Sequence, residues 1–194
     1  MKALTAVGLI VLLLLRPGLA VAEAPGDQVP QSIDQLLVIL KDPRLKAVGN
    51  EDQRRTKLKE VIYQRFDFTE MARRSLGPEW RRRTAEEQKE FVVLFTKLLE
   101  RACLNTIESY NGEKVQYLNE RAENSGAQVD TKITDNKGRD FLVNYRLHDV
   151  NGDWKIYDVV VEDVSLVNNY RAQFSRVLAK SSYAELVNTM KEKI

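Results

Sequence analysis

The residue types that do chemistry are scarce and scattered in this sequence. His148, beside Asp149, is the only histidine, and Cys103 is the only cysteine. A catalytic triad needs a nucleophile and an orienting acid around the histidine, but no Gly-x-Ser-x-Gly elbow and no phosphate-cradling glycine loop occurs. One histidine and one cysteine cannot complete a closed zinc site. The sequence therefore predicts a protein that is not an enzyme and uses no metal ion or cofactor.

Both residues have simpler structural interpretations. His148 falls at a predicted strand end next to a turn, which favours a solvent-facing side chain. Cys103 has no second cysteine for an internal disulfide, and it falls on the apolar side of a predicted helix. We expect a buried, inert thiol there, with a reactive thiol as the alternative.

A cluster of positive charge surrounds Trp80 in the sequence. Its members are Arg73, Arg74, Arg81, Arg82 and Arg83. Such a cluster favours contact with anionic lipid headgroups or with an acidic partner. The alternative is a solvated face whose charge is balanced by nearby acids. Those acids are Glu70, Glu79, Glu86 and Glu87.

The chain begins like an exported protein. Lys2 precedes an apolar run over residues 3–15, and residues 20–22 form a small-x-small cleavage site. The run is shorter than the roughly 20 apolar residues of a membrane span, although an uncleaved anchor is the alternative. The predicted division is a signal peptide over residues 1–22, extending to 24 at the longest, a flexible lead-in over 23–30, and a single domain over 31–194.

Export changes the meaning of the charge balance. The chain has 30 basic and 28 acidic residues, but Lys2 and Arg16 would leave with the signal and no acid would, so 28 of each remain. A mature chain without net charge lacks the basic character that supports nucleic-acid binding. Its length suits one domain with a sizeable core.

Amphipathic helices are predicted in the first part of the mature chain and again at its end. Four segments before residue 111 and two after residue 165 carry apolar residues at helical spacing. Ser32 is expected to begin the first helix and Pro43 to end it. Thr84 and Glu87 form a capping box that begins the longest helix.

Four strand-like runs lie between the two groups of helices. The runs over 127–133 and 141–147 alternate apolar and polar residues, the run over 115–121 is a weak candidate, and the last run has three consecutive valines. Turn-rich links at 124–126, 135–138 and 151–152 separate the four runs, which predicts an antiparallel meander. Residues 154–174 join the last run directly to a helix, with no loop long enough for an active site. The fold class is therefore α+β, with a four-stranded antiparallel sheet and amphipathic helices packed on one face.

Long motifs in this chain resemble the MlaC-type toluene-tolerance family of periplasmic proteins. They are FDFTEMARRSLGPEW at residues 66–80, TAEEQKEFVVLFTKLL at 84–99 and WKIYDVVVEDVSLVNNYRAQF at 154–174. The resemblance covers about residues 31–190. Asp163 stands where this family commonly has a small residue, often glycine, at the bend from strand to helix.

The resemblance implies a soluble periplasmic phospholipid carrier, exported by a cleaved signal peptide and serving outer-membrane lipid asymmetry. Such carriers shuttle lipid between an inner-membrane ABC transporter complex of the MCE type and an outer-membrane lipoprotein complex. Their helices and sheet enclose a deep apolar cavity for the acyl chains. We expect a monomer whose partners are phospholipid and these two complexes.

Apolar faces within the matched motifs and the strands between them supply the expected cavity walls. The lipid-binding candidates are Phe68, Met71, Leu76, Phe95, Leu98, Leu99, Val129, Val143, Tyr145, Tyr157, Val159, Val161, Leu166, Tyr170 and Phe174. Each has ordinary core packing as its alternative, because such faces usually fill protein interiors. Arg171, in the last motif, is a candidate for contact with a headgroup or a partner.

Two interpretations stay open at this level. A carrier, whether of phospholipid or of another lipid such as a hopanoid, predicts an apolar cavity. A non-enzymatic protein-interaction module of the envelope predicts a filled core and an exposed apolar patch.

Overall fold

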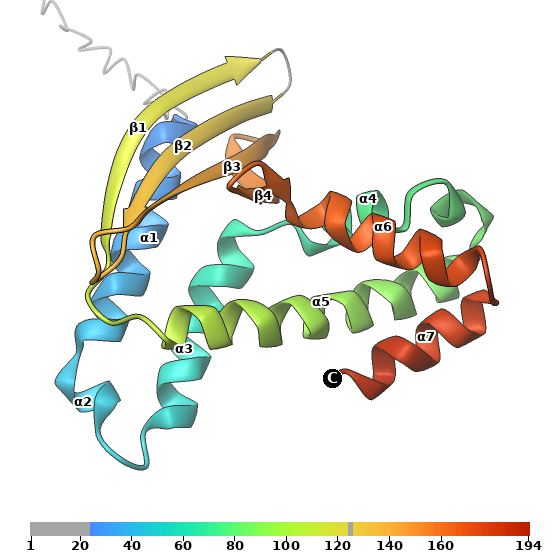
Figure 1. The fold of residues 1–194 in the computed structure, drawn as a ribbon, viewed down its shortest axis with the longest axis horizontal. Coiled ribbons are helices and arrows are strands. Elements are labelled where there is room, and N and C mark those ends of the chain that lie inside the picture. The colour runs from blue at the N-terminus through green and yellow to red at the C-terminus, as the bar shows by residue number, and fades with distance from the viewer. Residues whose placement is uncertain (1–23, 124–125) are drawn as a thin grey trace, which may run out of the picture.

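The computed structural model describes residues 24–123 and 126–194, so the predicted signal peptide over 1–22 lies outside the described residues. The helices are α1 Pro25–Lys41, α2 Pro43–Lys46, α3 Glu51–Arg65, α4 Phe68–Leu76, the 3-10 helix η1 Gly77–Arg82, α5 Ala85–Glu108, α6 Leu166–Leu178 and α7 Tyr183–Glu192. The strands are β1 Lys114–Glu123, β2 Gly126–Thr134, β3 Asp140–Val150, β4 Asp153–Val161 and β5 Val164–Ser165. Figure 1 shows the long strands beside α1 at one end of the molecule, α4, α6 and α7 at the other, and α5 running lengthwise between the two ends. None of the helices in this part of the chain is long and apolar enough to cross a membrane.

Side-chain caps fix where the central helices begin. The Thr84 hydroxyl accepts from the backbone N of Glu87 at 3.2 Å, and the Glu87 carboxylate accepts from the backbone N of Thr84 at 2.8 Å. This is the predicted capping box of α5. Asp67 caps α4 by accepting from the backbone N of Glu70, and Gly77, with a φ of +64°, ends that helix. The predicted start of α5 is therefore confirmed.

Helix α1 begins earlier than predicted. It starts at Pro25, and the Ser32 hydroxyl, expected to cap it, donates to the carbonyl of Gln28 inside the helix. Most of the segment expected to be a flexible lead-in is therefore helical. Packing explains the difference, because Val29 is 1% exposed and lies in an apolar cluster with the sheet. That burial outweighs the helix-breaking tendency of Pro30.

The sheet is antiparallel throughout and follows the order β1-β2-β3-β4-β5. It has five strands, so the predicted number of four was wrong. Glu162 and Asp163, with φ of 47° and 63°, form a two-residue turn that brings Val164 and Ser165 back beside β4. A strand of two residues is too short to produce an alternating pattern, which is why the sequence did not reveal it.

Two apolar clusters stabilise the fold. The larger one joins the helices and includes Phe91 and Phe95, both fully buried. The smaller one lies between α1 and one face of the sheet, where Val29 meets Leu147. Phe66, between α3 and α4, packs against both clusters. The core is therefore divided into two clusters, and Phe66 lies at the boundary between them, which is called the seam below.

Helices meet both faces of the sheet. Leu147 and Ile156 face α1, whereas Arg146 and Asp158, which pair across β3 and β4, point to the opposite side. Arg146 and Leu147 are neighbours in β3 and therefore alternate. In β4, the register shift between these two pairs places Asp158 on the other face from Ile156, although the two residues are two positions apart. Helix α6 follows β5 directly and packs with α4 against that side of β4. The prediction that all helices pack on one face was therefore wrong, because the tight turn at Glu162 leads the chain back across the other face.

Candidate functional site

The predicted wall residues of the helices lie together in the larger apolar cluster. Its buried members include Phe68, Met71, Leu76, Phe95, Leu99 and Phe174. Tyr157, Leu166 and Tyr170 are partly buried against them, and Leu98 is partly buried outside both clusters. These side chains contact one another as packed core, and the described residues do not show the deep apolar cavity that the family resemblance implied.

The predicted wall residues of the sheet fall mainly in the smaller cluster. Val129 is buried there, and Tyr145 and Val159 are partly buried against it. Val143 is 6% exposed but belongs to neither cluster, and Val161 is 44% exposed. The helix and sheet candidates therefore occupy two clusters that meet at the seam.

Aromatic rings dominate the contact between α5 and α6. Phe95 meets Tyr170 edge-on, with ring centroids 5.4 Å apart, and Phe91 meets Phe174 edge-on at 5.6 Å. Edge-to-face pairs of this kind are favourable beyond the area that they bury. They hold α6 against the longest helix.

An aromatic groove of about 400 Å³ opens beside the seam between the two clusters. It is lined by Tyr63, Phe66, Asp67, Phe68, Thr69, Val92, Thr96, Val150 and Lys155. The centroid of the Phe68 ring lies 5.1 Å from that of the Tyr63 ring and 5.9 Å from that of the Phe66 ring. Because Phe66 contacts both clusters, the aromatic groove gives access to the place where they meet.

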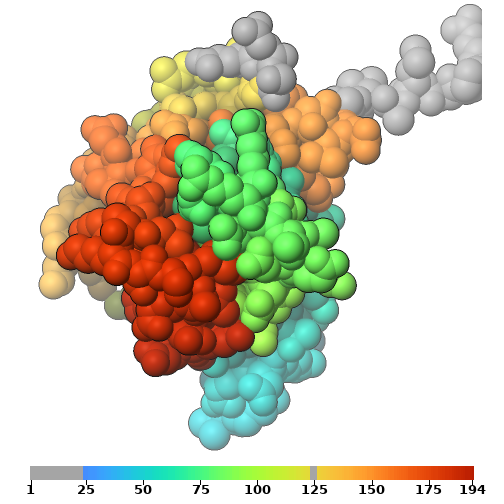
Figure 2. Space-filling view, turned by 90° about the vertical axis from the view of Figure 1, so that its right-hand side faces the viewer, coloured from blue at the N-terminus to red at the C-terminus, as the bar shows by residue number. Residues whose placement is uncertain are grey.

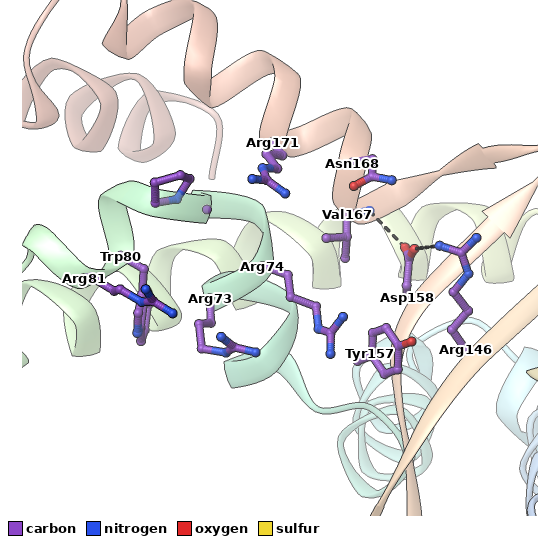
Figure 3. A pocket seen from close by; sticks show the side chains of 12 residues that line it. Arg73, Arg74, Trp80, Arg81, Arg146, Tyr157, Asp158, Val167, Asn168 and Arg171 are labelled. Carbon is purple, nitrogen blue, oxygen red and sulfur yellow. Dashed lines mark hydrogen bonds and ion pairs between the residues drawn. The ribbon is translucent and has the colours of Figure 1, made fainter. Parts of the chain in front are cut away.

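A basic cleft of about 460 Å³ lies between α4, η1 and α6, against β3 and β4. It is lined by Arg73, Arg74, Gly77, Pro78, Trp80, Arg81, Arg146, Tyr157, Asp158, Val167, Asn168 and Arg171. Figure 3 shows guanidinium groups reaching it from α4, from β3 and from α6. Figure 2 shows this end of the molecule, with the α4–η1 segment beside α6 and α7. Five arginines and one carboxylate line the cleft.

The carboxylates near the cleft are engaged by neighbouring groups. The Glu70 carboxylate accepts hydrogen bonds from the guanidinium groups of Arg73 and Arg74 at 2.5–2.6 Å. Burial alone would raise the pKa of this carboxyl, but the hydrogen bonds outweigh burial, so the pKa is lowered. Asp158, 3% exposed, accepts from the Ser165 hydroxyl, the Val167 backbone and Arg146.

The aromatic groove and the basic cleft are connected by direct contacts. Asp67 lines the groove, and its Oδ2 atom lies 3.0 Å from Nε2 of His148. The His148 ring meets Tyr157 edge-on at 5.7 Å, and the Arg74 guanidinium, in the cleft, lies 3.9 Å over the Tyr157 ring. The prediction of a solvent-facing turn histidine was therefore wrong, because Asp67, which caps α4, and Tyr157 of β4 partly cover the His148 ring.

Sequence reasoning identified part of the basic cleft. Arg73, Arg74 and Arg81 of the arginine cluster around Trp80 line it, and so does Arg171. Arg82 and Arg83 instead pair with Glu79. Arg146 and Asp158 were missed, because each stands within a predicted strand and only the tertiary fold brings them beside α6.

Metal binding and thiol chemistry find little support in the described part of the chain. It contains no group of three or more His, Cys, Asp or Glu side chains placed to hold a metal ion. Cys103 is partly buried, and burial raises the pKa of its thiol to about 11. The thiol is therefore protonated at neutral pH.

The fold, an antiparallel sheet with helices before and after it, is that of an α+β domain. The profile of the MlaC protein family matches residues 30–192, and this chain belongs to that family. It is 26% identical over 177 residues to the toluene tolerance protein ttg2D of Pseudomonas putida, covering 90% of this chain and 82% of that protein. It is 22% identical over 179 residues to the intermembrane phospholipid transport system binding protein MlaC of Haemophilus influenzae, covering 89% of this chain and 84% of that protein.

A solved structure has the same fold. The phospholipid-binding protein from Ralstonia solanacearum, determined in complex with a phospholipid, superposes with a TM-score of 0.77 at 24% identity. The match covers 88% of this chain and 97% of that chain. The predicted α+β class is therefore confirmed.

Proposed function

We propose that this protein is a periplasmic phospholipid carrier that moves lipid between an inner-membrane ABC transporter complex and an outer-membrane complex. The observation that carries the proposal is the fold shared with the Ralstonia solanacearum protein, which was solved with a phospholipid bound. Membership of the MlaC family supports it. So does the name of the Haemophilus influenzae relative, which refers to intermembrane phospholipid transport.

The mechanism is sequestration and release of acyl chains. Burying hydrocarbon gains about 0.8 kcal/mol per CH₂, so two chains of about sixteen carbons gain on the order of 25 kcal/mol relative to water. Lipid in a bilayer is already dry, and the net preference for the carrier over the bilayer is much smaller. A carrier of this kind makes and breaks no covalent bond, and it needs neither a catalytic residue nor a cofactor.

Acyl chains enter at the aromatic groove under this proposal. Phe66 and Phe68 line the groove and also belong to the apolar packing of the larger cluster. Lipid entry separates side chains along the seam, and it replaces contacts among apolar side chains by contacts between those side chains and hydrocarbon. Both arrangements exclude water, so the exchange changes the free energy little.

Mass spectrometry of the purified protein tests this function. The mature protein is purified without detergent and extracted with organic solvent, and the extract is analysed for lipid. Stoichiometric phospholipid is the expected result. A hopanoid in place of phospholipid would change the cargo but keep the mechanism, and a folded protein that holds no lipid and takes none from vesicles would overturn the proposal.

Neighbouring valines on α5 provide a matched pair for the entry site. Val92 lines the aromatic groove, whereas Val93 is 48% exposed on the adjacent face of the same helix. We expect V92E to reduce uptake of lipid from vesicles and V93E to leave it unchanged, with circular dichroism showing that both variants are folded. Equal uptake by the two variants would place the entry site elsewhere.

A protein-interaction module of the envelope is the second candidate. The packed state of the larger cluster favours it, because a filled core is what such a module requires. The lipid analysis separates the two functions, since a module of this kind carries no stoichiometric lipid.

A further inference from the structure

We propose that the basic cleft is a binding site for a phosphate group. That this phosphate belongs to the headgroup of a carried lipid rests on the proposed function, whereas the phosphate chemistry rests on the cleft alone. The volume of the cleft, about 460 Å³, lies within the usual range for small-molecule sites.

The charge of the cleft is only partly neutralised from within. Two guanidinium groups, those of Arg73 and Arg74, share the single carboxylate of Glu70. Arg81 and Arg171 are exposed and have no ion-pair partner among residues 24–123 and 126–194. The cleft therefore retains positive charge that an oxyanion would balance.

The one lining carboxylate, that of Asp158, pairs with Arg146 and makes no ion pair with the other four arginines of the cleft. Both oxygens of Asp158 accept hydrogen bonds, Oδ1 from the Val167 backbone at 3.0 Å, and Oδ2 from Ser165 at 2.6 Å and Arg146 at 3.2 Å. Asp158 thereby holds the first turn of α6 in place at the edge of the cleft. The N-terminal end of a helix carries partial positive charge, which adds to the field of the arginines.

Two of the arginines lie close against neighbouring groups. The Arg74 guanidinium lies 3.9 Å over the ring of Tyr157. Arg171 passes close to the backbone of Gly77, where a Cβ atom would lie 2.9 Å from Nε of the arginine. The absence of a side chain at Gly77 therefore leaves room for Arg171. The Arg74 guanidinium, packed on the Tyr157 ring in this way, loses less conformational entropy when it binds a phosphate, and arginines can engage phosphate oxygens in bidentate pairs.

The position of the cleft suits a lipid headgroup. The contacts from Asp67 through His148 and Tyr157 to Arg74 lead directly from the aromatic groove to the cleft. A diacyl phospholipid whose tails enter at the groove has its phosphate close to the cleft. A phosphate-free diacylglycerol would use the groove alone.

The first experiment measures anion binding. Titration of the wild-type protein with inorganic phosphate and with glycerol 3-phosphate is followed by ³¹P NMR, and the double variant R81Q/R171Q is compared with R101Q/R176Q. All four arginines are exposed, so both variants lose two surface charges, but the second pair lies outside the cleft. We expect at least a tenfold loss of affinity in R81Q/R171Q and less than a twofold change in the control. Equal affinities, or no binding to the wild type, would overturn the phosphate site.

The second experiment identifies the source of the phosphate. Uptake of phosphatidylglycerol and of diacylglycerol with the same acyl chains is measured from vesicles. Wild type should prefer the phosphate-bearing lipid, and R81Q/R171Q should lose that preference while its diacylglycerol uptake is unchanged.

Phosphate binding without uptake of either lipid would refute the carrier function and keep the site. Uptake of both lipids independent of Arg81 and Arg171 would refute the site and keep the carrier. Binding of a glutamate-rich peptide without phosphate binding would assign the cleft to an acidic protein and overturn the proposal.

Discussion

Oδ1 of Asp158 accepts a hydrogen bond from the backbone N of Val167 at 3.0 Å, and this contact joins the last long strand to the helix that follows it. The first backbone N–H groups of a helix have no partner within the helix, so a carboxylate at this position satisfies one of them. The Ser165 hydroxyl caps the same helix by accepting from the backbone N of Asn168. Asp158 thus positions α6, and with it the wall of the basic cleft that carries Arg171.

Removing the charge of Asp158 should destabilise the protein strongly. The side chain is 3% exposed and accepts from three donors. D158N keeps the shape but loses at least one of these hydrogen bonds and leaves Arg146 without its carboxylate. We expect a loss of about 2–4 kcal/mol in the free energy of unfolding, measured by urea denaturation.

The control for this variant is D34N, on the exposed side of α1. Its unfolding free energy should change by less than about 0.5 kcal/mol. If D158N were no less stable than D34N, the cap on α6 would not be a source of stability.

The sequence predicted the regular elements well wherever side chains alone determine them. The capping box at Thr84 and Glu87 fixed the start of α5 because its hydrogen bonds are local. The first helix was predicted too short, because its start depends on the contact of Val29 with the sheet, which lies far away in the sequence. The fifth strand was missed because its pairing follows from the turn at Glu162 and Asp163.

The site was harder to predict, for a related reason. Periodicity identifies an apolar face but not what covers it, so Phe68 and Phe95 looked alike in the sequence. In the structure Phe68 lines the aromatic groove and Phe95 is sealed inside the cluster. The arginines around Trp80 were visible as a charge cluster, whereas Arg146 joins them only through the pairing of β3 with β4.

Truncation of Phe95 should be costly, because its ring is fully buried among aromatic neighbours. It contacts Tyr170 at 5.4 Å and Phe174 at 6.0 Å between ring centroids. We expect F95A to lose about 3–5 kcal/mol of unfolding free energy. V93A, on the exposed side of α5, should lose less than about 1 kcal/mol in the same urea titration. A loss in F95A no larger than that of V93A would mean that this part of the core is loosely packed.

The turn between β4 and β5 is a place where substitution should stabilise the protein. Asp163 has a φ of +63°, a conformation that glycine adopts without strain. We expect D163G to gain up to about 1 kcal/mol, since relief of the left-handed strain exceeds the entropy that glycine loses on folding. D163A, which keeps the Cβ and removes the carboxylate, should not gain. A lower melting temperature in D163G than in the wild type would show that the aspartate side chain stabilises this turn.

The reactivity of Cys103 tests the burial of its helix face. Burial raises the pKa of the thiol to about 11, and the thiolate is the form that reacts. At pH 8 the thiolate fraction is therefore about a hundredfold below that of an unperturbed cysteine of pKa near 9, and alkylation should be slower by about the same factor. Iodoacetamide labelling of the folded protein, followed by mass spectrometry, measures this rate, and urea-unfolded protein serves as the control. The rate should rise tenfold for each pH unit between 8 and 10. A folded-state rate equal to the unfolded one at pH 8 would mean that water reaches the thiol and that the apolar face around it is open.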